Sequence, residues 1–199
     1  MDRRMVKTRL EIKQAFIHLL KEQSFDELTV KEIANEANIN RATFYKHYED
    51  KYDLIAHLEE AIITKVRVII EESSPIDLTT NILNQPAYQT IVDMYRYIGS
   101  ERELIEVLIS PKGNQSFLTH MQFLLENMLK NHFVHIQPSK DRVAELELLV
   151  VYLASAHLGL MKHWLLKRLT YTPEEMAKML MEILRDGPAA VLAGLTKEI

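Results

Sequence analysis

The chain has 199 residues, of which 47% are apolar and 26% charged, a composition typical of globular proteins that fits one domain or two small ones. It contains no cysteine, which excludes disulfides, thiolate zinc sites and cysteine nucleophiles. The formal net charge is −4, yet the leading segment is basic, with Arg3, Arg4, Lys7 and Arg9 against Asp2. A basic segment ahead of an acidic body is compatible with a nucleic-acid partner.

No stretch has the pattern of a targeting or membrane segment. The N-terminal residues MDRRMVKTRLEIKQ lack the apolar run of a signal peptide. The most apolar window, Leu148 to Met161, is interrupted by His157, and at about 14 residues it is shorter than the roughly 20 that a spanning helix needs. We therefore expect a cytoplasmic protein with no membrane partner.

The spacing of apolar residues predicts an all-α protein, since only five Gly and six Pro interrupt a pattern of helical period. Thr29 and Glu32 form a capping box that begins a short helix, and Thr172-Pro173-Glu174-Glu175 begins a late one. Gly187-Pro188 ends that late helix. The predicted helices are 6–22, 29–37, 41–47, 51–72, 86–98, 101–109, 116–134, 140–168, 173–185 and a short piece at 188–195.

Two domains are expected along this chain. The first, residues 1–51, holds three helices, and the second, residues 52–199, is all-helical, with helix 51–72 linking the two. The stretch SSPIDL, residues 73–78, marks the change from short helices to longer and more apolar ones. Loops are predicted at 110–114 and 137–140 from their turn-forming residues.

Residues 29–48 have the pattern of a helix-turn-helix, in which a second short helix can enter the DNA major groove. Asn38 tolerates the left-handed backbone needed for the turn, and Asn40 is a favourable N-cap. Phe44 and Tyr48, four residues apart, share the inward face, and Ile39 fills the angle between the helices. The polar and amphipathic side chains that remain are directed outward, where phosphates and base edges need donors: Arg41, Thr43, Tyr45, Lys46 and His47.

This stretch, TVKEIANEANINRATFYKHYEDKYDLI, resembles the DNA-binding signature of the TetR-type (tetracycline-repressor-like) regulators. Asn38 stands where the family usually has Gly, Asn40 replaces Ser, and Tyr48 replaces Phe, and each replacement keeps the physical role. The positions in register with the family pattern are Thr29, Ile33, Ala34, Ala37, Ile39, Thr43, Phe44, Tyr45, His47, Lys51 and Leu54.

The resemblance implies a DNA-binding role for nine residues. Thr43, Tyr45 and His47 are implied to contact phosphates or sugars, as are Lys51 and Thr29 at the starts of their helices. Arg41, Ala42 and Lys46 are implied to read bases. The ninth residue is the N-cap Asn40. The basic leading segment would reach the backbone or an adjacent minor groove, as such segments do elsewhere.

The resemblance also implies a homodimer and a near-palindromic operator on double-stranded DNA. The helices at 140–168 and 173–185 would form the dimer's four-helix bundle. The sequences SPKGNQSFL and GLMKHWLLKRLTYTPEEMAKML resemble one branch of the family, which includes regulators akin to the dihydroxyacetone-kinase operon activator. The implied function is that of a ligand-responsive transcriptional regulator, and repression of transcription is the usual effect. Activation through a protein partner is the alternative.

A small-molecule effector would bind the second domain. Methionine and aromatic side chains make adaptable pocket walls, although the same residues also serve as plain core. The candidate effector-binding residues are Tyr88, Met94, His120, Met121, His157, Met161 and Trp164. No cofactor is expected.

Other chemistry is poorly supported by the sequence. His132 and His135 lie three residues apart, but no nearby Asp, Glu or Cys completes a zinc site by spacing, so no metal is expected. The chain has no Gly-rich phosphate loop and no nucleophile elbow, and we predict that it is not an enzyme. A protein-docking module of the same fold is the remaining alternative.

Overall fold

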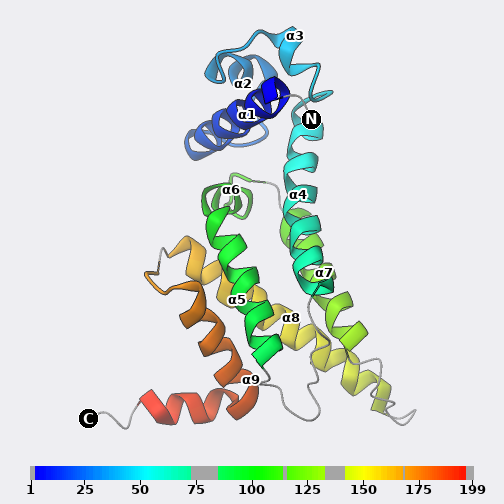
Figure 1. Ribbon diagram of the computed structural model, residues 1–199, viewed down its shortest axis with the longest axis vertical. Helices are drawn as coiled ribbons and strands as arrows, with labels where there is room; N and C mark the ends of the chain where they lie inside the picture. Colours follow the sequence, from blue (N-terminus) through cyan, green and yellow to red (C-terminus); the bar gives the residue numbers. More distant parts are fainter. Residues whose placement is uncertain (1–2, 73–84, 114–115, 133–141, 168, 196–199) are drawn as a thin grey trace. The chain divides into compact units, whose positions relative to one another are not determined.

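The computed structural model describes residues 3–72, 85–113, 116–132, 142–167 and 169–195 (Figure 1). Within these ranges the regular elements are α-helices and no strand occurs, which confirms the all-α prediction. The helices are α1 (Arg3–Glu22), α2 (Val30–Glu36), α3 (Arg41–Phe44), α4 (Lys51–Glu71), α5 (Gln85–Ser100), α6 (Arg102–Leu108), α7 (Ser116–His132), α8 (Val143–Leu166) and α9 (Pro173–Leu195).

Contacts divide the chain into two compact units. The first comprises residues 1–64 together with 102–119, and the second comprises residues 65–101 together with 120–199. Helices α4 and α7 each contribute residues to both units. The predicted domains, 1–51 and 52–199, stay a prediction, but this grouping adds a segment from far along the sequence to the first unit: α6 and the start of α7.

In the first unit, α1 packs on α2 and α6, and α2 packs on α3. The apolar stripe of α1 supplies Phe16 and Leu20 to the core, α2 supplies Ile33, and α3 supplies Phe44. Each of these side chains is at most 1% exposed. The helix-turn-helix is thus held by the inward face that the sequence predicts.

Local signals in this unit act as predicted. The Thr29 side chain accepts a hydrogen bond from the backbone N–H of Glu32 at 3.3 Å, and the Glu32 carboxylate accepts one from the backbone N–H of Thr29 at 2.8 Å. These contacts confirm the capping box, and the bonds from Thr29 hold the pKa of Glu32 below its usual value. Asn40 caps α3, its Oδ1 accepting from the Thr43 backbone N–H at 2.7 Å.

The turn between α2 and α3 depends on Asn38, whose φ of 53° makes it the one non-glycine residue with positive φ among those described. Asn38→Ala is expected to lower the free energy of unfolding by about 1 kcal/mol, because a Cβ residue without a local hydrogen-bonding side chain is disfavoured there. Asn38→Gly is the control and should match the parent within a few tenths of a kcal/mol. Denaturant titration of the three proteins measures the difference; equal stability of the Ala and Gly variants would contradict this account of the turn.

Two predictions about helix ends are corrected. Helix α3 ends at Phe44, not His47, because the backbone N–H groups of Lys46 and His47 turn back to the carbonyls three residues earlier, Thr43 and Phe44, at 3.2 and 2.8 Å. Helix α1 begins at Arg3, so the described part of the basic leading segment is helical and not an extended arm. Its residues, such as Arg4 and Lys7, are good helix formers.

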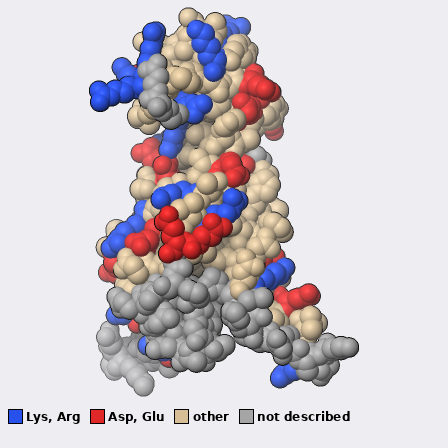
Figure 2. All heavy atoms as spheres, turned by 45° about the vertical axis from the view of Figure 1, so that its right-hand side comes forward, with Lys and Arg blue, Asp and Glu red and all other residues tan. Residues whose placement is uncertain are grey.

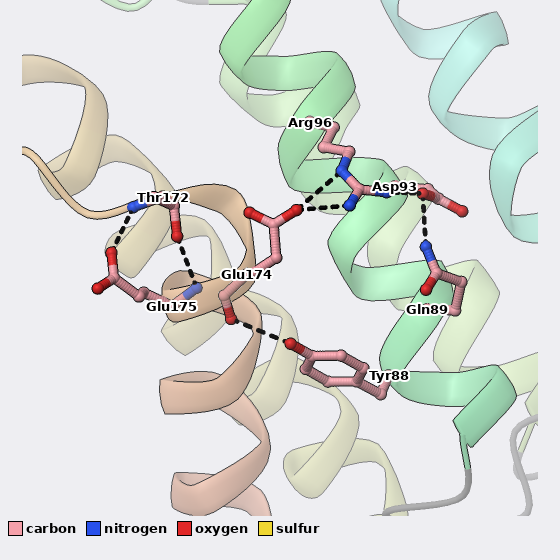
Figure 3. Close-up of polar contacts among 7 residues, drawn as sticks. All are labelled: Tyr88, Gln89, Asp93, Arg96, Thr172, Glu174 and Glu175. Carbon is pink, nitrogen blue, oxygen red and sulfur yellow. Dashed lines mark hydrogen bonds and ion pairs between the residues drawn. The ribbon is translucent and has the colours of Figure 1, made fainter.

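In the second unit, α5 and α9 lie side by side (Figure 1). Arg96 of α5 donates from Nε to Glu174 Oε1 at 2.9 Å and from a terminal nitrogen to Asp93 at 3.0 Å, and the Tyr88 hydroxyl donates to the Glu174 carbonyl at 3.4 Å (Figure 3). These contacts come from two helices that start far apart in the sequence. They position the first turn of α9 against α5.

The predicted start signal of α9 is present, and the predicted stop at Gly187-Pro188 is a break inside a longer helix. Thr172 and Glu175 form reciprocal hydrogen bonds of 2.7 and 3.2 Å ahead of the first turn (Figure 3). The helix runs to Leu195 but is interrupted at Gly187, whose φ of 79° and ψ of 161° are not helical. A residue with a Cβ is strained at this φ, so glycine permits the kink before Pro188.

Helix α8 is unusual in composition and exposure. It is the one helix of the described residues that is long and apolar enough to cross a membrane, judged by length and composition alone. The predicted apolar window, residues 148–161, lies within it. Large apolar side chains on α8 nevertheless remain exposed, among them Leu148 at 70% and Tyr152 at 56%. The face that carries them has no partner among the described residues of this chain.

Candidate nucleic-acid interface

Helix α3 and the turn that follows it carry two sets of side chains with different burial. Phe44 is 0% exposed and Tyr48 is 6% exposed, and their rings lie 5.8 Å apart. Tyr45 is 55% exposed, and Arg41, Ala42 and Lys46 are exposed as well. Anchoring from the inner face leaves the outer face of this short helix available for a ligand.

Positive charge surrounds this outer face. Figure 2 shows Lys and Arg side chains gathered over the upper part of the first unit. The exposed cations of this unit include Arg3, Arg4 and Lys7 of α1, together with Arg41 of α3 and Lys46 of the turn after it. A cluster of cations beside exposed hydrogen-bond donors is what a phosphate backbone requires.

Three of the predicted DNA-binding residues also take part in the caps of α2 and α3. Thr29 and Asn40 use their side-chain oxygens in the two caps, and the Thr43 hydroxyl, half-buried, donates to Asn40 Oδ1 at 2.9 Å. These side chains therefore shape the starts of α2 and α3, whatever contact to DNA the resemblance implies for them.

His47 is half-buried, and its Nδ1 is buried with no hydrogen-bond partner in the described part of the chain. Burial lowers the pKa of His47, and the charges of Arg9 and Lys46 lower it further. The imidazole is therefore neutral near pH 7 and offers one N–H as a donor. Arg9, which the sequence places only in the basic leading segment, thus lies within electrostatic reach of the interface.

Lys51 makes contacts that the resemblance does not anticipate. Its ammonium donates to the carbonyls of Phe25 and Asp26 at 2.9 and 2.8 Å, and it lies 5.0 Å from the centroid of the Phe25 ring. Two of its three donors are thus used within the protein, holding the start of α4 to the connection between α1 and α2. Long-range contacts of this kind leave no mark on local sequence spacing.

Family comparisons agree with this geometry. A model described as bacterial regulatory proteins of the tetR family matches residues 14–58, and one described as a transcriptional regulator C-terminal region matches residues 85–186, slightly more than half of the chain. The chain belongs to the TetR family of transcriptional regulators. Members of this family are DNA-binding regulators and not enzymes, which confirms both predictions.

Individual relatives extend the likeness over most of the chain. The uncharacterised helix-turn-helix regulator YxbF of Bacillus subtilis (strain 168) is 26% identical over 92% of this chain, which spans slightly less than half of YxbF, 46%. The solved structure of a TetR regulator from Streptococcus agalactiae 2603V is 26% identical, with a TM-score of 0.61 over 92% of this chain and 96% of that one. The dihydroxyacetone kinase operon activator DhaS shares the fold, with 16% identity and a TM-score of 0.59 over 92% and 97%.

The predicted effector-binding residues of this TetR-family regulator fall into three groups. Met94, Met121, Met161 and Trp164 are buried in the described part of the chain, at 5% exposure or less. Tyr88 and His157 are half-buried, and the Tyr88 hydroxyl is used between α5 and α9. His120 is exposed.

A cluster of rings that the sequence analysis did not single out connects two of these residues. Tyr95 of α5 lies 5.6 Å from the ring of His157 and 5.5 Å from that of Trp164, both on α8. The Tyr95 hydroxyl and His157 Nε2 are buried and have no hydrogen-bond partner among the described residues. Buried polar atoms are normally satisfied, so this pair is a candidate contact for a polar group of an effector or for water. The Tyr95 position follows the helical spacing of α5, but its partners on α8 do not show in the sequence.

Burial lowers the pKa of His157 to about 4, well below its usual value. The unfolded chain therefore takes up a proton near pH 6.5 that the folded protein does not. This contribution to stability is complete above about pH 6.5 and is lost as the pH falls toward 4; we expect a loss of about 2–3 kcal/mol. Urea titrations of the parent and His157→Gln between pH 4 and 7 measure it: the parent's advantage should shrink as pH falls, and a constant difference would contradict the assignment.

The possible histidine pair of the sequence analysis lies outside the described residues, since nothing is described of His135 or of the His132 side chain. Among the residues described, no group of three or more His, Cys, Asp or Glu side chains is placed to hold a metal ion.

Proposed function

We propose that this TetR-family chain is a ligand-responsive repressor that binds a near-palindromic operator as a homodimer in the cytoplasm. The observation that carries the DNA-binding part is the exposed outer face of α3 and its turn, with Arg41, Tyr45 and Lys46 beside the cations of α1. Arg41, Ala42 and Lys46 read base edges in this proposal, and Thr43, Tyr45 and His47 hold the phosphate backbone.

The proposed dimer accounts for the symmetry of the proposed operator. The exposed apolar face of α8, which includes Leu148 and Tyr152, offers a surface that a second copy would cover. Two copies related by a two-fold axis would place their α3 helices about 34–36 Å apart, or a multiple of that distance, so each half of the operator repeats the other in reverse.

The salt dependence of binding tests the DNA interface. Lys46→Ala should weaken binding and reduce the slope of log affinity against log salt by about 1, because the interface loses a cation that faces the anionic DNA as well as a base contact. Lys51→Ala is the matched comparison: with its ammonium bonded to the Phe25 and Asp26 carbonyls, its loss should weaken binding with a smaller change of slope. If Lys46→Ala leaves both affinity and slope unchanged, Lys46 does not contact DNA and the proposed reading face of α3 is wrong.

An effector is proposed for the second unit, near Tyr95, His157 and Trp164. The support is the pair of buried polar atoms, because an effector with one hydrogen-bonding group inside an apolar body would satisfy them. Operator affinity would then change on adding such a compound, and Tyr95→Phe should reduce the change. An affinity that responds to no added small molecule would indicate a constitutive binder. A reporter gene placed behind the operator distinguishes repression from activation through a partner protein.

A further inference from the structure

The C-terminal end of α1 receives a cap from a residue far along the chain. The last carbonyls of a helix have no partner within the helix. In α1 the carbonyls of Lys21 and Glu22 accept hydrogen bonds from the ammonium of Lys112, at 3.0 and 2.9 Å. Lys112 lies in the loop between α6 and α7 and outside residues 14–58, which match the DNA-binding family model.

Helix α6 and the same loop make two more contacts near this end of α1. The backbone N–H of Phe25 donates to the Lys112 carbonyl at 2.9 Å. Lys21 donates to the carboxylate of Glu103, on α6, at 2.7 Å. The side chain and the backbone of Lys112 thus contact consecutive parts of the chain where α1 ends and the connection to α2 begins.

The loop is shaped to present Lys112 in one way. The Ser110 hydroxyl donates to the Val107 carbonyl at 2.9 Å and accepts from the Lys112 backbone N–H at 3.2 Å. A Cβ at Gly113 would lie 2.3 Å from the carbonyl oxygens of Val107 and Leu108, so only glycine fits there. Hydrogen bonds and close packing therefore restrict the backbone on both sides of Lys112.

A second lysine holds the next part of the connection. The ammonium of Lys51 donates to the carbonyls of Phe25 and Asp26, three and four positions after Glu22, the last carbonyl that Lys112 caps. The segment 23–29, between α1 and α2, is therefore fixed at its start by Lys112 and in its middle by Lys51. Because α2 and α3 follow this segment directly, its position sets the orientation of the helix-turn-helix on α1.

We propose that Lys112 is a positioning residue for DNA binding, acting through the end of α1 and not through a contact to DNA. Its ammonium caps α1 and holds the 23–29 connection in the geometry that presents α3. The proposal rests on the proposed DNA binding of this chain. Measuring the DNA affinity of the parent protein in the same assay tests that binding separately.

The test compares Lys112→Met, which keeps the length and apolar stem of the side chain, with Lys112→Arg, which keeps donors for both carbonyls. Lys112→Met should weaken DNA binding about 3- to 30-fold, the usual range for coupling through packed contacts, with the salt slope unchanged. Lys112→Arg should restore most of the affinity.

Hydrogen exchange of the full chain should be faster at the Phe25 amide in Lys112→Met. Lys130→Met, an exposed lysine of α7, is the control for charge loss and should behave as the parent.

Three results would overturn the proposal. A salt slope reduced by about 1 in Lys112→Met would show a direct phosphate contact. Unchanged affinity together with unchanged exchange at Phe25 would show that the cap does not position the motif. Equal loss of affinity in Lys112→Met and Lys112→Arg would show that the ammonium–carbonyl bonds are not the cause. If the parent itself does not bind DNA, the proposed function fails and not this assignment.

Discussion

Phe44→Ala is expected to lower the free energy of unfolding by about 3–5 kcal/mol, the cost of removing a fully buried aromatic side chain from a packed core. Phe44 is the buried residue of α3, the helix that packs on α2, and its ring lies 5.8 Å from those of Tyr45 and Tyr48. Without it, α3 loses its main apolar contact with the core. Operator binding should be lost at temperatures where the rest of the protein remains folded.

Tyr45→Ala is the matched variant at the next residue, the C-cap of α3. Its side chain is largely exposed, so unfolding should change by no more than about 0.5 kcal/mol. DNA binding should nevertheless weaken by about tenfold, because an outward donor is removed. Thermal unfolding and fluorescence anisotropy with labelled DNA separate the two effects. Equal destabilisation by both variants, or unchanged binding in Tyr45→Ala, would contradict the division of α3 into a buried and a reading face.

The second large effect is expected at α8. Replacing Leu148 and Tyr152 by Glu places two charges on the exposed apolar face, four residues apart and so on one side of the helix. If a second copy covers this face, the double variant should sediment at the chain mass of 23.2 kDa while the parent sediments at twice that mass. Operator affinity should fall by about 100-fold or more, since two linked reading helices bind far more tightly than one.

Phe123→Glu provides the control for this experiment. Phe123 of α7 is also an exposed apolar residue, at 65%, but lies on another helix. It should leave the mass of the assembly unchanged. A double variant of α8 that remains dimeric would place the dimer interface elsewhere.

The parts of the structure that the sequence predicts are those set by neighbours within a few residues. Thr29 and Glu32, Asn38, and Asn40 each act on the backbone within four positions, and each does so as predicted. Phe44 and Tyr48 were assigned to the core from their four-residue spacing, and both are buried. Signals of this kind depend on helix and turn geometry alone.

The sequence does not predict contacts between residues that lie far apart along the chain. The resemblance implies a phosphate contact for Lys51, yet its ammonium contacts carbonyls that lie 25 and 26 positions earlier. The sequence places Lys112 only in a loop, although its partners lie about 90 positions away. The Tyr95–His157 pair joins two helices in the same way. Neither spacing nor propensity indicates which distant backbone a flexible cation will reach.

Selection of DNA fragments by the purified protein tests the central claim most directly. Fragments recovered from a random pool, over several rounds at fixed salt, should converge on an inverted repeat whose half-sites are one helical turn apart or a multiple of one turn. The same selection with the Arg41→Ala variant should relax the sequence at one position in each half-site, because a base reader is removed. Recovered fragments that match the starting pool, or that share one unrepeated motif, would contradict a dimer that reads its operator through α3.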